Sequence, residues 1–258
     1  MNNSNIIFIV ALILLYSCKE STIQDTMEEL NKGFTIYTIG DSTMANKPNP
    51  NENPERGWGQ MLHLFFNDTI IINNYAVNGR STRSFRNLKH WSKVYDSLED
   101  GDYVFIQFGH NDSKIKDSSR YTNPHTTFRH NLIRYVDETR AKGAHPILLS
   151  SIVRRKFNKY GVLLDTHGDY TLVTRLVAQE MEVPFIDLQY LTQVMEETYG
   201  PKGSLQLHLH YKAGEHPYYP EGIQDNTHLS VVGATNIAKM VSEELIRLTH
   251  PLAKYIIR

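Results

Sequence analysis

The chain has 258 residues, of which 40% are hydrophobic, and this is enough for one sizeable core. Its 27 Lys and Arg residues almost cancel its 28 Asp and Glu residues, so no global charge draws it to nucleic acid or to an acidic membrane surface. A single cysteine excludes an intrachain disulfide. We expect one domain over residues 32–258, whose charge preferences are local.

The N-terminus carries a run of ten apolar residues, at positions 6–15. A membrane-spanning helix needs about twenty, so the run instead suits the apolar part of a secretory signal. Cys18 follows the run and a small residue, as in a bacterial lipobox. We expect a lipoprotein signal peptide at residues 1–17 and a lipidated Cys18 with a polar tether at 18–31. The protein would then be exported and membrane-anchored, in the periplasm or at the cell surface; a cleaved soluble signal is the alternative.

Beyond the tether, short runs rich in β-branched residues alternate with longer segments of helical period. The short runs predict five strands, at residues 34–39, 69–73, 102–108, 145–153 and 183–188. The longer segments predict four helices, at residues 57–66, 126–143, 171–182 and 233–248. This alternation is typical of a doubly wound parallel sheet that is covered on both faces. One long stretch, residues 199–224, is expected to be irregular.

Glycines and small polar residues follow the first three predicted strands. Ser42 follows the first strand, Gly79 the second and Asn111 the third. Ligands of such sheets bind beyond the carboxyl ends of the strands, where tight turns aim backbone N–H groups at one point. Taken alone, Ser42 is as consistent with the cap of a following helix as with a nucleophile. Gly79 and Asn111 are likewise consistent with ordinary turn residues.

A catalytic serine needs a histidine base within hydrogen-bond reach, and usually a carboxylate that orients the imidazole. Asp225 lies three residues before His228, close enough for its carboxylate to reach the ring within a turn. This spacing is weak by itself, because His228 could equally cap the next helix. Acyl transfer also needs donors for the oxyanion, each worth about 3 kcal/mol. The backbone N–H groups of Ser42 and Gly79 and the side chain of Asn111 are the candidates.

Four short motifs contain these residues: GDSTM with Ser42, NYAVNGRS with Gly79, GHND with Asn111, and DNTH with Asp225 and His228. In type and order they resemble the four blocks of the SGNH (GDSL-type) hydrolases. Within that superfamily, the chain most resembles the rhamnogalacturonan acetylesterases, which deacetylate pectin.

The resemblance implies a flavodoxin-like three-layer α/β sandwich with a five-stranded parallel sheet, the SGNH hydrolase fold, and chemistry that needs no cofactor. It implies that Ser42 attacks the acetyl carbonyl, that His228 acts as base and then as acid, and that Asp225 orients His228. Ser42 N–H, Gly79 N–H and Asn111 would hold the oxyanion. The stretch after the fourth predicted strand differs from the shorter segment expected there, which leaves the substrate-facing wall open.

Four histidines fall within 21 residues: His208, His210, His216 and His228. Two of them alternate, as metal ligands on one face of a strand do. His228 already has a role in the family chemistry, so we expect no metal and favour a loop that walls the substrate pocket. Tyr218 and Tyr219, with Tyr211, would stack there on sugar rings. A tyrosine-rich loop packed on the core is the alternative.

Six basic residues follow the second and fourth predicted strands: Arg80, Arg83, Arg86, Arg154, Arg155 and Lys156. The guanidinium fork of arginine matches the geometry of a carboxylate. We therefore hypothesise that some of them, with Arg80, Arg83 and Arg154 as candidates, bind galacturonate carboxylates of a pectic backbone. Solvated surface arginines would give the same pattern.

Together these features predict an exported serine esterase that removes acetyl groups from a plant cell-wall polysaccharide, with rhamnogalacturonan placed first. Another glycan such as xylan, or a small acyl ester, is the alternative within the enzyme class. An inactive glycan-binding surface lipoprotein is the alternative outside it. We expect a monomer that has the glycan as its partner and no metal or cofactor.

Overall fold

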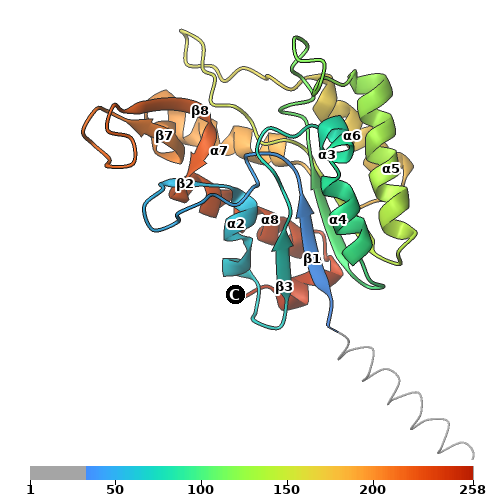
Figure 1. The fold of residues 1–258 in the computed structure, drawn as a ribbon. Helices are drawn as coiled ribbons and strands as arrows, with labels where there is room; N and C mark the ends of the chain where they lie inside the picture. The colour runs from blue at the N-terminus through green and yellow to red at the C-terminus, as the bar shows by residue number, and fades with distance from the viewer. Residues whose placement is uncertain (1–32, 258) are drawn as a thin grey trace, which may run out of the picture. The chain divides into compact units, whose positions relative to one another are not determined.

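The computed structural model describes residues 33–257 (Figure 1). The predicted signal peptide, Cys18 and the tether lie outside the described residues. A five-stranded parallel sheet has the order β3-β1-β4-β5-β6. Its strands are β1 (Thr35–Ile39), β3 (Ile71–Asn74), β4 (Tyr103–Gln107), β5 (His145–Leu149) and β6 (Phe185–Ile186). The predicted sheet and its five strands are confirmed, with bounds that differ by a few residues.

Strand β1 lies between β3 and β4 and pairs with both. Thr38 of β1 is opposite Asn74 of β3 and Phe105 of β4. Because the three strands run in the same direction, their carboxyl ends lie side by side at one edge of the sheet. The loops that follow the first three predicted strands therefore begin next to one another, at the edge where such sheets bind ligands.

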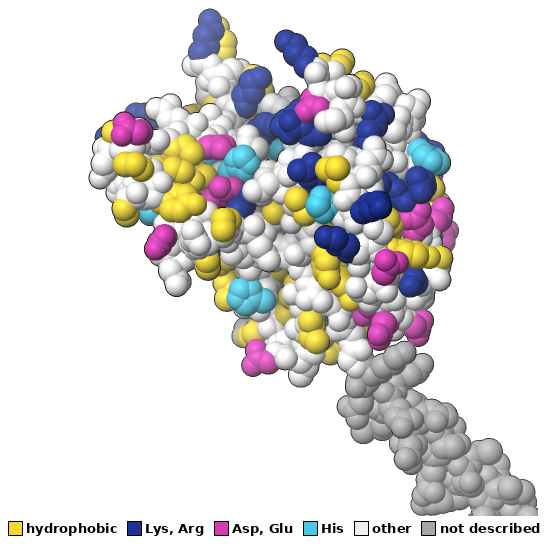
Figure 2. Space-filling view, in the orientation of Figure 1, with side chains coloured by type: hydrophobic (Ala, Val, Ile, Leu, Met, Phe, Trp, Pro, Cys, Tyr) yellow, Lys and Arg dark blue, Asp and Glu magenta, His cyan; other side chains and the backbone are white. Residues whose placement is uncertain are grey.

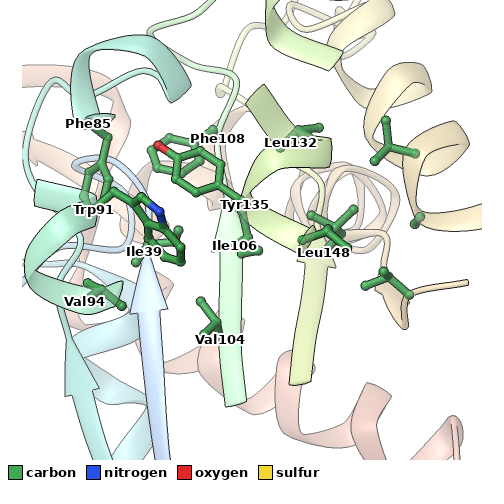
Figure 3. Close-up of a cluster of buried hydrophobic side chains, with 14 of the residues drawn as sticks. Ile39, Phe85, Trp91, Val94, Val104, Ile106, Phe108, Leu132, Tyr135 and Leu148 are labelled. Carbon is green, nitrogen blue, oxygen red and sulfur yellow. The ribbon is translucent and has the colours of Figure 1, made fainter. Parts of the chain in front are cut away.

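Four helices cover one face of the sheet: α3 (Thr82–Asn87), α4 (His90–Ser97), α5 (Arg129–Arg140) and α6 (Asp169–Glu180). Successive strand residues point to opposite faces, and Ile39, Ile106 and Leu148 point to this one. They belong to one buried cluster with Trp91 of α4 and Tyr135 of α5 (Figure 3). Burial of each such side chain contributes about 1.5–3 kcal/mol, so this layer holds the strand ends in place.

The opposite face is covered by α8 (Val231–Arg247) and the short α2 (Trp58–Met61), as Figure 1 shows. Trp58 is fully buried, and its Nε1 donates to the Gln107 side chain of β4 at 2.9 Å. The predicted helix 57–66 is confirmed as an α-helix only over Trp58–Met61, because α2 passes directly into a 3₁₀ turn, Leu62–Phe65. Its apolar spacing does not distinguish the two kinds of turn. Within residues 33–257, no helix is long and apolar enough to cross a membrane.

A second, antiparallel sheet is not predicted by the sequence pattern. It has the order β2-β8-β7 and contains β2 (Glu55–Arg56), β8 (Ile223–Ser230) and β7 (His208–Tyr211). The stretch expected to be irregular instead contains the end of α7 (Leu188–Gly203), all of β7 and the hairpin that leads to β8. Strand β8 includes Asp and Asn, which strands disfavour, so pairing with two neighbours makes it a strand where local propensity does not.

Candidate active site

Ser42 lies in a tight turn directly after β1. The backbone carbonyl of Asp41 accepts hydrogen bonds from the N–H groups of Met44 and Ala45, at 3.2 and 3.0 Å. The buried Asp41 carboxylate accepts the Thr43 backbone N–H and hydroxyl, at 3.0 and 2.9 Å. Of the two alternatives for Ser42, the helix cap is not found, since the next helix is α2 (Trp58–Met61). The turn itself, held by Asp41, presents the serine.

His228 of β8 reaches this turn from the second sheet. Its Nε2 lies 2.9 Å from Oγ of Ser42, and its Nδ1 lies 2.6 Å from one carboxylate oxygen of Asp225. The other carboxylate oxygen accepts the backbone N–H groups of Thr227 and His228, at 2.7 and 2.9 Å. Because a carboxylate only accepts, Nδ1 carries the ring hydrogen, and Nε2 accepts from the serine hydroxyl. The structure thus brings together three predicted residues, although Ser42 and His228 are 186 positions apart.

The electrostatics of this pair favour its charged form. Burial opposes ionisation of Asp225, but hydrogen bonds from His228 and from the Thr227 N–H outweigh it and hold the pKa of Asp225 well below its usual range. The hydrogen bond to Asp225 raises the pKa of His228 despite partial burial; Glu55 adds to this rise, and Lys47 opposes it. An Asp225 that stays ionised can stabilise the imidazolium that forms when His228 takes a proton.

Two loops on neighbouring strands carry the predicted oxyanion donors. Gly79 follows β3 with a φ of +73°, a conformation that residues with a Cβ disfavour. Asn111 follows β4; its Nδ2 donates to the Arg80 carbonyl at 3.1 Å, and its Oδ1 accepts from Arg120 at 3.4 Å. These two contacts determine which way the amide faces. Since Nδ2 carries two hydrogens, the second can be donated to an oxyanion.

Asp112, next to Asn111, joins these two loops. Its fully buried carboxylate accepts the Thr82 N–H at 3.1 Å and the hydroxyls of Thr82 and Thr122, each at 2.6 Å. Thr82 begins α3, three residues after Gly79. Burial raises the pKa of Asp112 to about 7 despite these hydrogen bonds. The Asp112 carboxyl group therefore helps to hold together the two loops that carry Gly79 and Asn111, beside the hydrogen bond from Asn111 to the Arg80 carbonyl.

A buried lysine that the sequence pattern does not single out joins the nucleophile turn to its neighbours. The Lys47 side chain is 1% exposed, and its Nζ lies 2.7 Å from Oε1 of Glu55 on β2. Nζ also donates to the backbone carbonyl of Ser42 at 2.7 Å and to the Asn78 side chain at 2.9 Å. Only its place five residues after Ser42 marks Lys47 in the sequence.

The predicted carboxylate-binding residues after the fourth strand are used by the protein itself. The Arg154 guanidinium donates to the carbonyl of His110 at 2.9 Å and to the hydroxyl of Thr166 at 3.0 Å. Arg155 donates to the side chain of Asn226 at 2.9 Å. These contacts give Arg154 a structural role, and its contact with a substrate stays a prediction.

The basic residues after the second predicted strand also make contacts within the protein. Arg86 pairs with Glu138 of α5 and packs over the Tyr135 ring, so it is part of the helical layer. Arg80 and Arg83 follow β3 in the chain, next to Gly79, and Arg83 donates to the Ser118 carbonyl at 3.0 Å. Their contact with a substrate stays a prediction.

Tyr218 and Tyr219 lie in the hairpin between β7 and β8. Tyr219 stacks with Tyr211 at a centroid distance of 6.1 Å, and Tyr218 meets Tyr219 edge-on at 5.1 Å. Burial, together with the negative charges of Glu55 and Asp225, raises the pKa of Tyr219 to about 12. This tyrosine thus lies near the carboxylate of the triad, where a sugar ring next to a bound ester could meet it.

The other histidines of this region have partners within the protein. His208 is buried, with Nε2 2.6 Å from a Glu196 oxygen and Nδ1 3.1 Å from the His228 carbonyl. His210 Nε2 lies 2.9 Å from the Asn226 side-chain oxygen. In the part of the chain that the structure describes, no three His, Cys, Asp or Glu side chains form a group that could hold a metal ion. The rings of His208 and His210 instead contact β8, the strand that carries Asp225 and His228.

A serine, a histidine and an aspartate linked by hydrogen bonds, with donor loops on adjacent strand ends, define a site for ester hydrolysis. The chain belongs to the GDSL-like Lipase/Acylhydrolase family, which it matches over residues 38–234. It is therefore a carboxylic ester hydrolase, and the predicted SGNH resemblance is confirmed.

The chain is also similar to individual proteins of known sequence or structure. The chain is 39% identical over 228 residues to the rhamnogalacturonan acetylesterase RhgT of Bacillus subtilis, an overlap that covers 88% of this chain and 96% of RhgT. It is similar to the crystal structure of YxiM from B. subtilis, with 27% identity and a TM-score of 0.73, over 84% of this chain and 57% of that chain. It shares the fold of Axe2, an acetylxylan esterase of Geobacillus stearothermophilus, with 19% identity, a TM-score of 0.59, and coverage of 83% and 94%.

Proposed function

We propose that this esterase removes acetyl groups from rhamnogalacturonan, a plant cell-wall polysaccharide. The observation that carries the proposal is the hydrogen-bonded series Ser42, His228 and Asp225 at the sheet edge where Gly79 and Asn111 also lie. The similarity to RhgT over most of both chains supports the choice of glycan.

The reaction follows from the positions of the donors and acceptors. Ser42 Oγ attacks the acetyl carbonyl while His228 Nε2 accepts the hydroxyl proton, and Asp225 stabilises the imidazolium. The N–H groups of Ser42 and Gly79 and the amide of Asn111 hold the oxyanion. His228 gives its proton to the departing sugar oxygen, which leaves an acetyl group on Ser42. Water then loses a proton to His228 and attacks this ester, and His228 returns the proton to Ser42 Oγ as the bond to the acetyl group breaks and the acid leaves.

The N-terminal segment adds a location to this proposal. A signal peptide at residues 1–17 directs export, and a lipid on Cys18 holds the enzyme at the membrane, in the periplasm or at the cell surface. The apolar run and the position of Cys18 support this part of the proposal. The enzyme acts as a monomer, and Tyr218 and Tyr219 stack on sugar rings beside the ester.

Replacement of the nucleophile tests the proposal. Ser42→Ala should lower kcat for acetate release by at least about 10³-fold, because no other group at the site can form the acetyl-enzyme. Release is measured from acetylated rhamnogalacturonan, acetylated xylan and p-nitrophenyl acetate. Ser92→Ala, which changes an exposed serine of α4, is the matched control and should retain full activity.

Each other outcome has a definite meaning. Retained release by Ser42→Ala would remove the nucleophile assignment. Faster release of acetate from xylan than from rhamnogalacturonan would show that xylan is the preferred glycan. The assignment of Ser42, His228 and Asp225 would stand. No release from any ester by the unmodified protein would favour an inactive glycan-binding lipoprotein.

A further inference from the structure

The part of β8 that carries the proposed base is a bulge that β7 does not pair with. His208 of β7 is opposite Leu229 of β8, but the next residue of β7, Leu209, is opposite Asp225. Residues 226–228 therefore have no partner on β7, and their backbone groups need hydrogen bonds from elsewhere. The bulge, as we call residues 226–228, ends at the base itself.

Groups outside the β7 ladder supply these hydrogen bonds. The Asp225 carboxylate accepts two N–H groups of the bulge, and the Arg155 N–H donates to the Asn226 carbonyl at 2.8 Å. At the end of the bulge, the His228 carbonyl lies 3.1 Å from Nδ1 of the His208 ring. A carbonyl oxygen only accepts, so Nδ1 carries a hydrogen and donates it. The backbone of the base is thus held by a side chain of β7.

The second nitrogen of the His208 ring faces a buried carboxylate. Nε2 lies 2.6 Å from Oε1 of Glu196 on α7, and the two side chains are 1% and 2% exposed. The other carboxylate oxygen of Glu196 is buried and accepts no hydrogen bond within residues 33–257. Acceptors thus face both ring nitrogens, so a second proton must lie between Nε2 and Oε1. Histidine is the stronger base of the two side chains, and the ring therefore carries this proton as an imidazolium.

We propose that His208 is a positioning residue for the reaction: as an imidazolium neutralised by Glu196, it fixes the backbone of His228 to α7. The inference rests on the proposed function for the role of His228 as base, but not for the glycan. The ring cannot turn without leaving the buried carboxylate unpaired, which raises the free energy of the folded state.

The two histidine–carboxylate pairs of this region differ in exposure and in task. His228 and Asp225 are 32% and 25% exposed, and Figure 2 shows histidine and acidic side chains together on the surface beside the β7–β8 hairpin. The pair of His208 and Glu196 is buried. The first pair orients the ring of the base, and the second holds its main chain.

Nitrogen NMR of the resting enzyme, with isotope-labelled histidine, tests the charge of the ring. At neutral pH both ring nitrogens of His208 should have the chemical shifts of protonated nitrogens, and these signals should disappear in His208→Asn. In Glu196→Gln the amide can donate to Nε2, so this nitrogen should lose its proton while the hydrogen bond remains. An unprotonated Nε2 in the unmodified protein would overturn the imidazolium.

Two double variants test the positioning role. Both contain Glu196→Gln, which removes the buried negative charge, and His208→Asn or His208→Leu is added to it. The amide nitrogen of Asn can replace Nδ1 as the donor to the His228 carbonyl, whereas Leu, of similar size, has no donor. With p-nitrophenyl acetate, kcat should be at least about tenfold lower for the Leu variant than for the Asn variant, with KM alike, because a displaced base slows the chemical step without changing ester binding.

The control is a histidine–carboxylate pair at the surface. His125 meets Asp169 of α6 at 3.0 Å in an exposed pair, and His125→Gln should retain full activity. Equal kcat in the two double variants, with both folded by thermal unfolding, would overturn the positioning role. The NMR measurement does not require acetate release, so an unmodified protein that cleaves no ester would contradict the proposed function and leave the charge of the ring as a separate result.

Discussion

At the scale of single residues, Lys47 joins three segments whose relative positions the reaction depends on. Its ammonium group contacts the nucleophile turn at the Ser42 carbonyl, the loop before Gly79 through Asn78, and β2 through Glu55. Strand β2 pairs in turn with β8, which carries the histidine. Burial of a cation without such partners raises the free energy of the folded state. The fold therefore requires these three contacts of Lys47 to form together.

Lys47 and Glu55 should shift the pH dependence of the reaction in opposite directions. His228 must be neutral to accept the serine proton, so its pKa sets the acid limb of kcat/KM. Lys47→Met removes a charge that lowers this pKa, and the limb should move to higher pH with kcat reduced at least about tenfold. Glu55→Gln removes a charge that raises it, and the limb should move to lower pH. Profiles with p-nitrophenyl acetate measure both.

The conservative variant separates charge from packing. Lys47→Arg keeps the positive charge, so its acid limb should stay near that of the unmodified enzyme even where kcat falls. Shifts in the same direction for Lys47→Met and Glu55→Gln would contradict the electrostatic account.

At the scale of elements, Asp112 couples the loop before α3 to the loop after β4. The pKa of about 7 in the folded protein lies above the value of about 3.9 for an unfolded aspartate. Between these values the folded state keeps a proton that the unfolded state releases, so the contribution of Asp112 to stability falls as pH rises. Asn does not titrate. The unfolding free energy of the enzyme, relative to Asp112→Asn, should therefore fall from about pH 4 to about pH 7.

Urea unfolding at several pH values measures this difference. The same variant should lower kcat more than about tenfold, because Gly79 and Asn111 lie on the two loops that Asp112 joins. Parallel curves of stability against pH would show that the carboxyl is not protonated in the fold. An unchanged kcat would show that the donors do not depend on it.

The elements differ in how far the sequence predicts them. The three central strands of the parallel sheet are mostly buried, and all five strands coincide with short apolar runs, so all five were predictable. Strand β8 has no such signal, because its residues include the Asp225 to His228 turn and its partners are a two-residue and a four-residue strand. The sequence did not separate a turn from a helix start at Ser42, since serine and aspartate are common in both kinds of structure.

At the scale of the whole molecule, the sequence predicts some residues of the site and misses others. Ser42, Gly79 and Asn111 were predictable as candidates because they follow predicted strands, and Asp225 and His228 because of their spacing and the order of the four motifs. Lys47 was not, because its role depends on which distant segments become neighbours. The strand-end rule also places a backbone but not the direction of a side chain, so it does not predict the contacts that Arg154 makes with His110 and Thr166.

The proposed anchor is tested on the full-length protein. Cys18→Ser should move the protein from the membrane fraction to the soluble fraction of an exporting bacterium and should abolish incorporation of labelled palmitate. The activity on p-nitrophenyl acetate should not change, because residues 34–257 supply the whole site. A soluble, unlabelled unmodified protein would contradict the anchor.

The nucleophile follows a strand of the parallel sheet, and the base lies in the antiparallel sheet. This placement determines when activity can begin. Ser42 follows the first strand, whereas His228 lies 186 positions later on a strand that must pair on both edges. A growing chain, which is synthesised from its N-terminus, therefore contains the serine long before it contains the base. Hydrolysis can begin only after β8 has been made and has paired, so an incomplete chain cannot cleave esters.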